Sequence, residues 1–259
     1  MTDHIVVMTA GRVRGVDLQT TPAAGLRPPA PADIDAVIFD AGGVLLLPDA
    51  DAGRSAIAAL GHQTSAEDWR RAHYATLPLL DQMGQIDWPA HRRAMAAEIG
   101  VPGEHVHAAG ALIDEIMSRD WVAVDGAAAA LQALADAGYQ LAVVSNAGGT
   151  VAQWLERQGV CSVTLAGMPR VAIVVDSSLV GVEKPDPAIF AFALDALDTE
   201  PGRCLYIGDT VRFDVTGALA AGLHPVHVDP YGGCPGAHLH IAGLTDLTEW
   251  LAAGGAAAG

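Results

Sequence analysis

Residues 36–44 read Ala36-Val37-Ile38-Phe39-Asp40-Ala41-Gly42-Gly43-Val44, and this stretch decides the fold. Four apolar residues in a row end abruptly at Asp40, and two glycines follow soon after. A short, continuous apolar run predicts a strand that is buried on both faces, as in a parallel sheet. The glycine pair predicts a tight turn after that strand. The carboxylate of Asp40 is therefore expected at the carboxyl end of a buried strand.

Three later apolar runs end in the same way. They are Leu141–Val144 before Ser145-Asn146, Cys204–Ile207 before Gly208-Asp209, and His224–Val228 before Asp229. Helical stretches are predicted among them at Ala127–Ala137, Val151–Gln158 and Pro187–Leu197. Strands that alternate with helices predict an α/β fold, with a parallel sheet and helices on both of its faces. Open sheets of this kind place their active sites just beyond the carboxyl ends of the strands.

The segment between the first two predicted strands is far too long for a simple connection. Its middle, roughly Ser55–Arg119, contains helix-like stretches at Glu67–Leu80, Pro89–Ile99 and Glu104–Ser118 and no convincing strand. We therefore expect a small helical domain inserted into the α/β core. The predicted division is an N-terminal extension over residues 1–33, a core over 34–48 and 122–259, and the helical insert over 49–121. Within the extension, Ile5–Met8 is read as a short strand and Thr21–Pro31 as a linker rich in Pro and Ala.

The chain is acidic and rich in apolar residues. Its 259 residues include 14 Lys and Arg against 30 Asp and Glu, which gives a formal charge of −16, and 51% of them are hydrophobic. This charge disfavours binding to nucleic acid or to an anionic membrane surface, because both attract basic patches. The three cysteines, Cys161, Cys204 and Cys234, form no C-x-x-C pair, which favours reduced thiols. No signal peptide or membrane span is expected, so the predicted location is the cytoplasm.

Four polar segments follow one another at or beside the predicted strand ends. They are Phe39–Val44, Val144–Asn146, Glu183–Pro187 and Gly208–Asp214. Each alone is a common turn or helix cap, but the four in this order, with a helical insert after the first, are strongly specific. With these segments the chain resembles the haloacid dehalogenase-like hydrolases over roughly Ala36–Leu251. The resemblance implies a Rossmann-like core, an α-helical cap formed by the insert, and a hydrolase that acts on a small phosphorylated metabolite.

The resemblance also implies a role for each residue at the site. Asp40 would be the nucleophile that attacks phosphorus and forms an aspartyl phosphate, and Lys184 would neutralise charge. Asp40, Asp209 and the carbonyl oxygen of Gly42 would bind Mg²⁺, with Asp214 as a further ligand or as an orienting group. The phosphoryl oxygens would be bound by Ser145, Asn146 and the turn at Gly43.

Composition supports the role of Lys184. The other 13 basic residues of the 14 are Arg, so Lys184 is the only lysine in the chain. Against such a bias, a lysine kept only for the surface is unexpected. A compact ammonium group suits a crowded dianion site where the fork of an Arg would not fit.

Gly42 departs from the pattern of the family's phosphatases, which have a second Asp two residues after the nucleophile. That Asp protonates the leaving group, and its loss costs typically 10²–10⁴-fold for a poor leaving group. Asp49, Asp51 or a histidine of the insert could substitute, although a helix cap is the preferred interpretation of the two aspartates. An Asp introduced at Gly42 would be disfavoured if the turn requires a positive φ there.

Three other functions are considered for this reason. Haloacid dehalogenases also lack the second Asp, but they lose the acidic metal site as well, and here Asp209 and Asp214 are present. Phosphonoacetaldehyde hydrolases need a lysine in the cap for a Schiff base, and the insert has none. A non-catalytic or regulatory binding protein on the same scaffold stays open as the alternative.

The insert is expected to select the substrate, with one or two of its polar or aromatic side chains in contact. The candidates are Arg54, Trp69, Arg70, His73, Tyr74, Trp88, His91, Arg92 and Arg93. We expect Trp69 and Trp88 to pack inside the insert and the Arg pairs to face solvent. His224, His227, His238 and His240 alternate near the C-terminus, and for them a structural role is preferred to a metal site. The sequence does not determine the metabolite or the oligomeric state.

Overall fold

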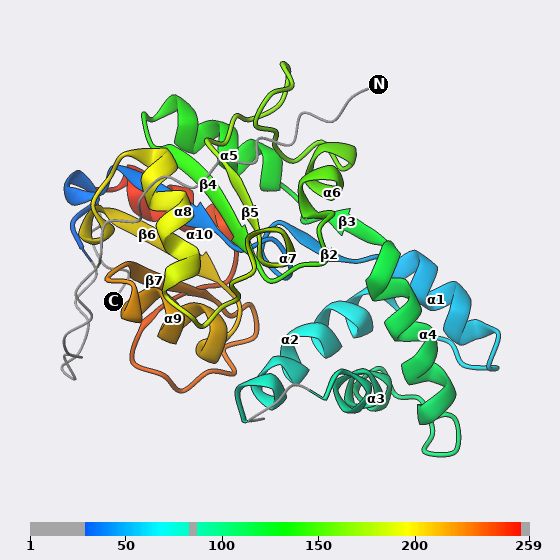
Figure 1. The fold of residues 1–259 in the computed structure, drawn as a ribbon. Helices are drawn as coiled ribbons and strands as arrows, with labels where there is room; N and C mark the ends of the chain where they lie inside the picture. Colours follow the sequence, from blue (N-terminus) through cyan, green and yellow to red (C-terminus); the bar gives the residue numbers. More distant parts are fainter. Residues whose placement is uncertain (1–28, 83–86, 255–259) are drawn as a thin grey trace.

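The computed structural model describes residues 29–82 and 87–254, and its centre is one six-stranded sheet (Figure 1). The strands are β1 (Ala36–Phe39), β4 (Gln140–Ser145), β5 (Val174–Asp176), β6 (Cys204–Gly208), β7 (His224–Val228) and β8 (Leu239–Ile241). They lie in the order β5-β4-β1-β6-β7-β8, and every neighbouring pair is parallel. The predicted parallel α/β sheet is confirmed. The predicted strand at Ile5–Met8 and most of the linker at Thr21–Pro31 lie outside the described residues.

Helices cover both faces of the sheet, as predicted. One face carries α5 (Ala127–Asp136), α6 (Val151–Arg157) and α10 (Leu244–Ala252), and the other carries α8 (Ala188–Leu197) and α9 (Gly217–Ala220). The buried run of β1 supplies both cores, because successive side chains of a strand point to opposite faces. Val37 and Phe39 pack with the first group of helices, and Ala36 and Ile38 with the second. The remaining short elements are η1 (Pro31–Asp33), α7 (Ser177–Val180), η2 (Pro201–Arg203) and the π-helix η3 (Val211–Thr216).

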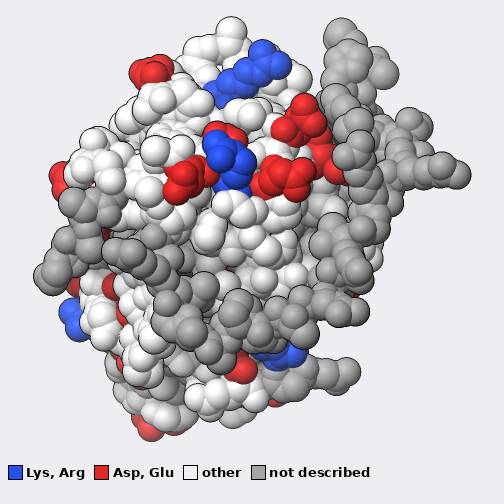
Figure 2. All heavy atoms as spheres, turned by 90° about the vertical axis from the view of Figure 1, so that its left-hand side faces the viewer, with Lys and Arg blue, Asp and Glu red and all other residues white. Residues whose placement is uncertain are grey.

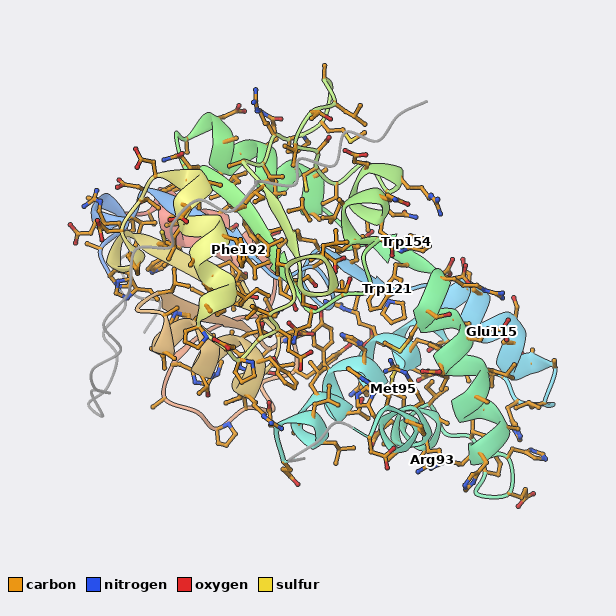
Figure 3. All side chains as sticks on the ribbon, in the orientation of Figure 1. Arg93, Met95, Glu115, Trp121, Trp154 and Phe192 are labelled. Atoms are coloured by element: carbon orange, nitrogen blue, oxygen red, sulfur yellow. The ribbon has the colours of Figure 1, made fainter. Side chains whose placement is uncertain are left out.

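Four helices form the insert, which lies beside the arrowheads of the sheet in Figure 1. They are α1 (Ala50–Ala58), α2 (Ala66–Gln82), α3 (Trp88–Glu98) and α4 (Val106–Arg119). The insert has its own core, in which Ile57, Trp69, Met95 and Ile113 are buried; Figure 3 labels Met95 there. The approach of α1 to α2 depends on Gly53, since a Cβ atom at that position would lie 2.4 Å from the ring of Trp69.

Two short strands join the insert to the sheet. They are β2 (Leu46–Pro48) and β3 (Trp121–Ala123), which pair antiparallel. The sequence did not predict them, because three-residue strands carry almost no periodic signal. Figure 3 labels Trp121 at this junction, and its indole N–H donates to the carbonyl oxygen of Met117 at 2.7 Å.

The surface shown in Figure 2 carries acidic side chains on either side of basic ones. Among the residues coloured there, the basic side chains do not form a stripe, which agrees with the formal charge of −16. Within residues 29–82 and 87–254, no helix is both long and apolar enough to cross a membrane.

Candidate active site

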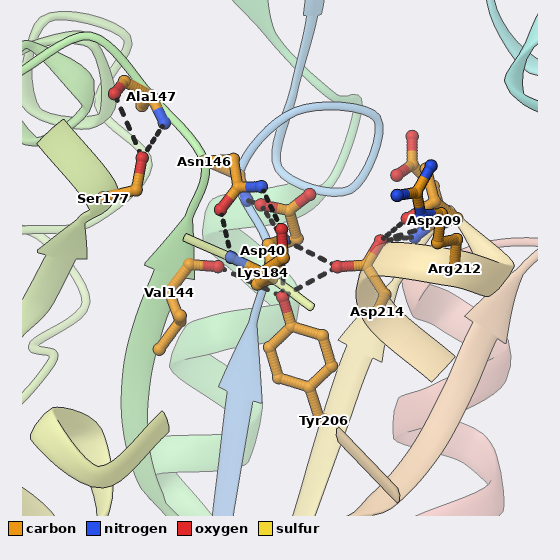
Figure 4. Close-up of polar contacts among 12 residues, drawn as sticks. Asp40, Val144, Asn146, Ala147, Ser177, Lys184, Tyr206, Asp209, Arg212 and Asp214 are labelled. Atoms are coloured by element: carbon orange, nitrogen blue, oxygen red, sulfur yellow. Dashed lines mark hydrogen bonds and ion pairs between the residues drawn. The ribbon is translucent and has the colours of Figure 1, made fainter. Parts of the chain in front are cut away.

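Three strand ends and one loop bring the predicted site residues together. Asp40 follows β1, Ser145 ends β4, and Asp209 follows β6. Because β1 lies between β4 and β6, the carboxyl ends of these strands are neighbours. Lys184, in the loop before α8, reaches the same place (Figure 4). The strand order therefore gathers side chains that stand far apart in the sequence.

Lys184 stands at the centre of the site. Its side chain is 2% exposed, and its Nζ lies 3.0 Å from Asp40 Oδ1, 2.6 Å from Asp214 Oδ1 and 2.8 Å from the hydroxyl of Tyr206. These three acceptors match the three hydrogens of an ammonium group. Burial alone would lower the pKa of Lys184, but the carboxylates of Asp214 and Asp40 outweigh it and raise that pKa. The only lysine of the chain is therefore a fixed positive charge beside Asp40.

Asp214 accepts hydrogen bonds on both carboxylate oxygens. Its Oδ1 faces Lys184 and the hydroxyl of Tyr206, while its Oδ2 accepts from the N–H of Asp209 and from the N–H and hydroxyl of Thr210. Burial raises the pKa of Asp214, but the charge of Lys184 and these hydrogen bonds outweigh it and lower that pKa. The acceptor sites of this carboxylate are thus already filled by the protein.

The three buried carboxylates carry more negative charge than Lys184 balances. Oxygen atoms of Asp40, Asp209 and Asp214 lie within 4.8 Å of one another. Burial raises the pKa of Asp40 to about 7; Asp214 and Asp209 add to the shift, and Lys184 opposes it. Burial and the neighbouring Asp214 also raise the pKa of Asp209. A hard divalent cation would offset this excess charge, and the donors are all oxygens, so the site fits Mg²⁺.

Gly43 approaches Asp209 so closely that no side chain fits. A Cβ atom at Gly43 would lie 1.7 Å from Asp209 Oδ2, and the φ of Gly43 is +73°. The N–H of Gly43, which the sequence assigned to phosphate binding, donates instead to the carbonyl oxygen of Leu46 at 2.7 Å. Gly43 therefore makes room for the carboxylate of Asp209 in this structure.

Gly42 is less constrained than the sequence suggested. Its φ is not positive. A Cβ atom at Gly42 would contact only the ring of Trp121, at 3.6 Å. That is an ordinary van der Waals contact. The turn does not require a positive φ at Gly42, because the left-handed residue of the pair is Gly43.

Ser145 and Asn146, at the end of β4, were both proposed to bind phosphate, but only Asn146 has its side chain engaged by Lys184. Ser145 is buried at the end of the strand. The amide of Asn146 is used by Lys184: its Oδ1 accepts the N–H of Lys184 at 2.7 Å, and its Nδ2 donates to the carbonyl oxygen of Lys184 at 2.9 Å. Asn146 therefore fixes the backbone that carries the lysine.

Hydrogen bonds from the end of β5 hold the loop that follows β4. The carboxylate of Asp176 accepts the N–H of Gly149 at 2.8 Å, and the hydroxyl of Ser177 lies 3.2 Å from the N–H of Ala147; Figure 4 shows the latter contact. Neither Asp176 nor Ser177 belongs to the four polar segments that the sequence singled out. Their contribution is to hold the loop beside Ser145 in one conformation.

Two side chains of α2 reach the site from the insert. His73 Nε2 lies 3.3 Å from Asp209 Oδ2, and the hydroxyl of Tyr74 donates to the carbonyl oxygen of Gly43 at 2.6 Å. Burial, with the charge of Arg92, lowers the pKa of His73 to about 4, so its imidazole is neutral near pH 7. These two are among the insert residues that the sequence proposed as substrate contacts.

The other candidates of the insert have structural partners. Trp69 is buried in the insert core, as predicted. Trp88 is not, because it is 44% exposed with the guanidinium of Arg92 4.9 Å above its ring. Arg92 also differs from prediction: it is 9% exposed, and its charge is balanced by Asp114. Arg54, at the surface, pairs with Asp51.

Neither aspartate proposed to replace the missing acid lies free at the site. Asp49 caps α1, and its Oδ1 accepts the N–H groups of Asp51 and Ala52 at 2.8 and 3.0 Å. Asp51 is exposed and bonded to Arg54. The preferred interpretation of Asp49 as a helix N-cap is confirmed.

A cavity of about 470 Å³ opens beside the carboxylates, between α2 and the loop after β7. Its walls include Tyr74, Leu77, Asp81, Asp209, His227 and Tyr231. A second hollow, of about 340 Å³, lies at the amino ends of the strands beside Pro31 and Tyr139, away from the carboxylates. Only the first combines enclosed space with the charged groups described above.

The sequence did not predict that the hydroxyl of Tyr206 belongs to the site. Its hydroxyl contacts Lys184, Asp214 and the carbonyl oxygen of Val144. A tyrosine inside the apolar run Cys204–Ile207 indicates a buried polar contact, since a buried phenol normally has a hydrogen-bond partner. Its partner could not be named without the fold.

Comparisons with known proteins identify the family. A family model described as haloacid dehalogenase-like hydrolase matches residues 34–222. The chain is 36% identical over 104 residues to haloacid dehalogenase-like hydrolase domain-containing protein 3 of Bos taurus, over 40% of this chain and 39% of that protein. It is 46% identical over 75 residues to N-acylneuraminate-9-phosphatase of Homo sapiens, over 27% of this chain and 30% of the relative. Each match thus spans well under half of the relative's length.

A solved structure supports the fold independently. The crystal structure of a HAD phosphatase from Thermococcus onnurineus superposes with a TM-score of 0.53 and 22% sequence identity. The match covers 84% of this chain and 98% of that one.

Proposed function

This chain belongs to the haloacid dehalogenase-like hydrolases, and from that membership we propose that it is a Mg²⁺-dependent phosphatase of a small metabolite. The observation that carries the proposal is the burial of the only lysine between Asp40 and Asp214, with Asp209 beside them. One relative named above, N-acylneuraminate-9-phosphatase of Homo sapiens, is a phosphatase by name, which supports this reaction class.

Asp40 is the proposed nucleophile. Its carboxylate attacks phosphorus, the bond to the leaving oxygen breaks, and an aspartyl phosphate forms on Asp40. Water then cleaves this intermediate and releases phosphate. Lys184 allows the two anions to approach, because its ammonium charge is fixed 3.0 Å from Asp40 Oδ1.

Asp40, Asp209 and the carbonyl oxygen of Gly42 are the proposed protein ligands of Mg²⁺. When bound, the cation would supply Lewis-acid stabilisation of charge on the phosphoryl oxygens. Asp214 is proposed as an orienting group rather than a direct ligand, since its oxygens already accept hydrogen bonds from Lys184, Asp209 and Thr210. It holds Lys184 and the backbone of Asp209 in place.

Ser145 and the backbone of the following loop are the proposed phosphate-binding groups. Asn146 contributes through Lys184, whose backbone it fixes. Gly43 contributes the space beside Asp209. The substrate would enter the cavity under α2, which Tyr74 lines. His73 contacts Asp209 from the same helix.

No described residue takes the place of the missing acid in this proposal. A neutral imidazole has a single N–H, and at His73 the Nε2 faces Asp209. Since its pKa is about 4, His73 is rarely protonated near pH 7. The leaving oxygen therefore departs largely without a proton, which favours substrates with good leaving groups.

The test is a panel of phosphorylated metabolites with Mg²⁺, read by released phosphate, for the wild type and Asp40→Asn. We expect Asp40→Asn to lose more than about 10³-fold in kcat, because the nucleophile is absent. Circular dichroism and the melting temperature should stay close to wild type. The matched control is Asp51→Asn, an exposed carboxylate of α1, which should keep full activity.

Phosphate release by Asp40→Asn at the wild-type rate would contradict the covalent mechanism. Halide release from a 2-haloacid without metal would point to the dehalogenase alternative. Binding of phosphorylated ligands without turnover across the panel would favour the non-catalytic alternative.

A further inference from the structure

A second cluster of metal-binding side chains lies at the C-terminal edge of the sheet, outside the carboxylate site. It consists of His227 on β7, Cys234 in the following loop, His238 just before β8, and His240 on β8. One ligand atom from each lies within 4.8 Å of all the others. The sequence suggested a structural role for the histidines, and it could not show that Cys234 joins them.

Hydrogen bonding does not account for the arrangement. His238 Nε2 lies 3.0 Å from His227 Nδ1, 3.0 Å from His240 Nε2 and 3.7 Å from Cys234 Sγ. One ring nitrogen has either one hydrogen or one lone pair, so it cannot satisfy three neighbours. In a tetrahedral Zn²⁺ site, with bonds of about 2.0–2.3 Å, neighbouring ligand atoms lie roughly 3.3–3.5 Å apart. The three distances from His238 Nε2 are close to those of such a site, and the other pairs of ligand atoms lie within 4.8 Å.

The tautomer of His227 is already suited to metal binding. Its Nε2 lies 3.0 Å from the carbonyl oxygen of Asp209, which can only accept a hydrogen bond. Nε2 therefore carries the hydrogen, and Nδ1 presents its lone pair to the cluster. Histidine ligands of metals usually have an outer partner of this kind, which fixes the orientation of the ring.

The loop places Cys234 and His238 by specific contacts. The carboxylate of Asp229 accepts the N–H groups of Gly233 and Cys234 at 3.0 and 2.8 Å. The N–H of Gly236 donates to Cys234 Sγ at 3.4 Å, which orients the sulfur. A Cβ atom on Gly236 would lie 2.4 Å from the ring of His238, so only glycine lets this ring enter the cluster.

We propose that His227, Cys234, His238 and His240 bind one Zn²⁺ ion in a closed tetrahedral site, distinct from the carboxylate site. Three imidazole nitrogens and one thiolate suit a borderline-soft metal and not Mg²⁺, which requires oxygen ligands. All four coordination positions are filled by the protein, which is the pattern of a structural site.

The ion would fix one wall of the cavity beside the active site. The loop carries Tyr231, whose hydroxyl donates to Glu67 of the insert at 2.8 Å. Tyr231 and Cys234 both line the cavity. His227 contacts the backbone of Asp209. The site therefore joins the edge of the sheet, the insert and the turn that carries Asp209.

Metal content tests the proposal directly. Protein without an affinity tag, reduced and loaded with excess Zn²⁺, is desalted, and the metal is measured by mass spectrometry. The wild type should retain about one Zn²⁺ per chain, and His238→Ala and Cys234→Ser well below half an ion. The matched control is His224→Ala, which should retain the full amount, because His224 contacts the carbonyl oxygen of Gly202 instead.

Cobalt substitution provides a readout that does not depend on activity. Co²⁺ bound to the wild type should show tetrahedral d–d bands and a thiolate charge-transfer band, and Cys234→Ser should lack the charge-transfer band. Asp40→Asn should keep both, which separates this site from the proposed phosphatase chemistry. No retained metal in the wild type, or equal retention in His238→Ala, would overturn the proposal.

Discussion

At the scale of single residues, Gly42 determines which leaving groups the proposed phosphatase can release. The family's phosphatases place an acid there, and in this chain the glycine faces the ring of Trp121. Neither Asp49 nor Asp51 replaces the acid, since one caps α1 and the other pairs with Arg54. The rate should therefore depend strongly on the pKa of the leaving group, because no acid protonates the leaving oxygen.

Gly42→Asp should raise the turnover of alkyl phosphates, by up to about 10²-fold, the lower end of the effect of a general acid. The backbone tolerates the change because Gly42 has no positive φ and its Cβ would meet only an ordinary contact. The measurement is kcat/KM for a series of alkyl and aryl phosphates. Wild type should depend steeply on the pKa of the leaving group, and Gly42→Asp much less.

A wild-type series in which alkyl and aryl phosphates react equally well would show that another group already acts as the acid. His73 would then be the first residue to replace, because it contacts Asp209 from the insert. Gly103→Asp, at an exposed glycine without near neighbours, is the control for an added carboxylate.

Asp209→Asn should separate metal binding from folding. Burial and Asp214 raise the pKa of Asp209, so without metal its negative charge is unfavourable in the fold. The metal-free variant should therefore melt no lower than wild type, while Mg²⁺ should raise the melting temperature of wild type only. Asp125→Asn, at an exposed carboxylate, should respond to Mg²⁺ as wild type does. An equal response of Asp209→Asn would remove Asp209 from the metal site.

At the scale of helices, a chain of polar contacts links α2, α3 and α4 of the insert. His91 Nε2 lies 3.1 Å from the hydroxyl of Thr76, and its Nδ1 lies 2.9 Å from Arg92 Nη1. Arg92 Nε in turn donates to Asp114 at 3.2 Å. A protonated His91 would place a positive charge against a guanidinium, so burial and Arg92 lower the pKa of His91 to about 3.

This chain of contacts predicts that acid destabilises the insert. The pKa of His91 is about 6.5 when unfolded and about 3 when folded, so at intermediate pH the unfolded state binds the extra proton. The stability due to neutral His91 is complete above pH 6.5 and falls with pH through this window, by up to about 1.4 kcal/mol per pH unit. Denaturant unfolding between pH 7.5 and pH 5 measures it.

His91→Gln should weaken this pH dependence, because glutamine does not titrate. His107→Gln, at an exposed histidine of α4, should leave the dependence unchanged. Equal pH profiles for wild type and His91→Gln would show that other groups cause the loss of stability in acid.

At the scale of the whole molecule, the insert contacts the rest of the chain through an apolar cluster of Leu77, Leu80 and Phe213 and through polar contacts around the cavity. Tyr74 donates to the carbonyl oxygen of Gly43, Asp81 accepts the N–H of Arg212 at 2.7 Å, and Tyr231 reaches Glu67. These contacts hold α2 over the carboxylates. Their loss should affect catalysis more than folding, because each half has a hydrophobic core of its own.

Tyr74→Phe should lower kcat/KM by about 2- to 10-fold, the range expected for one net hydrogen bond of 0.5–1.5 kcal/mol. The ring is kept, so the melting temperature should change little. Tyr139→Phe, at the amino end of β4, is the matched control and should leave kcat/KM unchanged. An unaltered kcat/KM in Tyr74→Phe would mean that its contact with the Gly43 carbonyl plays no part in turnover.

The sequence by itself determined the sheet, the helical insert and the family. Runs such as Ala36–Phe39 and Cys204–Ile207 are readable because burial on both faces demands continuous apolar residues. Asp40, Lys184 and Asp209 could be proposed because each stands at a strand end or in a motif. Short strands such as β2 and β3 were missed, because three residues are too few to show the alternation of apolar and polar residues that predicts a strand.

Only the tertiary structure decided which side chains meet. The positions of β4 and β6 on either side of β1 place Asn146 on the backbone of Lys184, and Tyr206 on its ammonium. The sequence spacing does not predict that His73 contacts Asp209, or that Cys234 lies beside three histidines. Sequence patterns record whether a residue is buried, whereas hydrogen bonds and metal ligation depend on distances between atoms that the fold alone brings together.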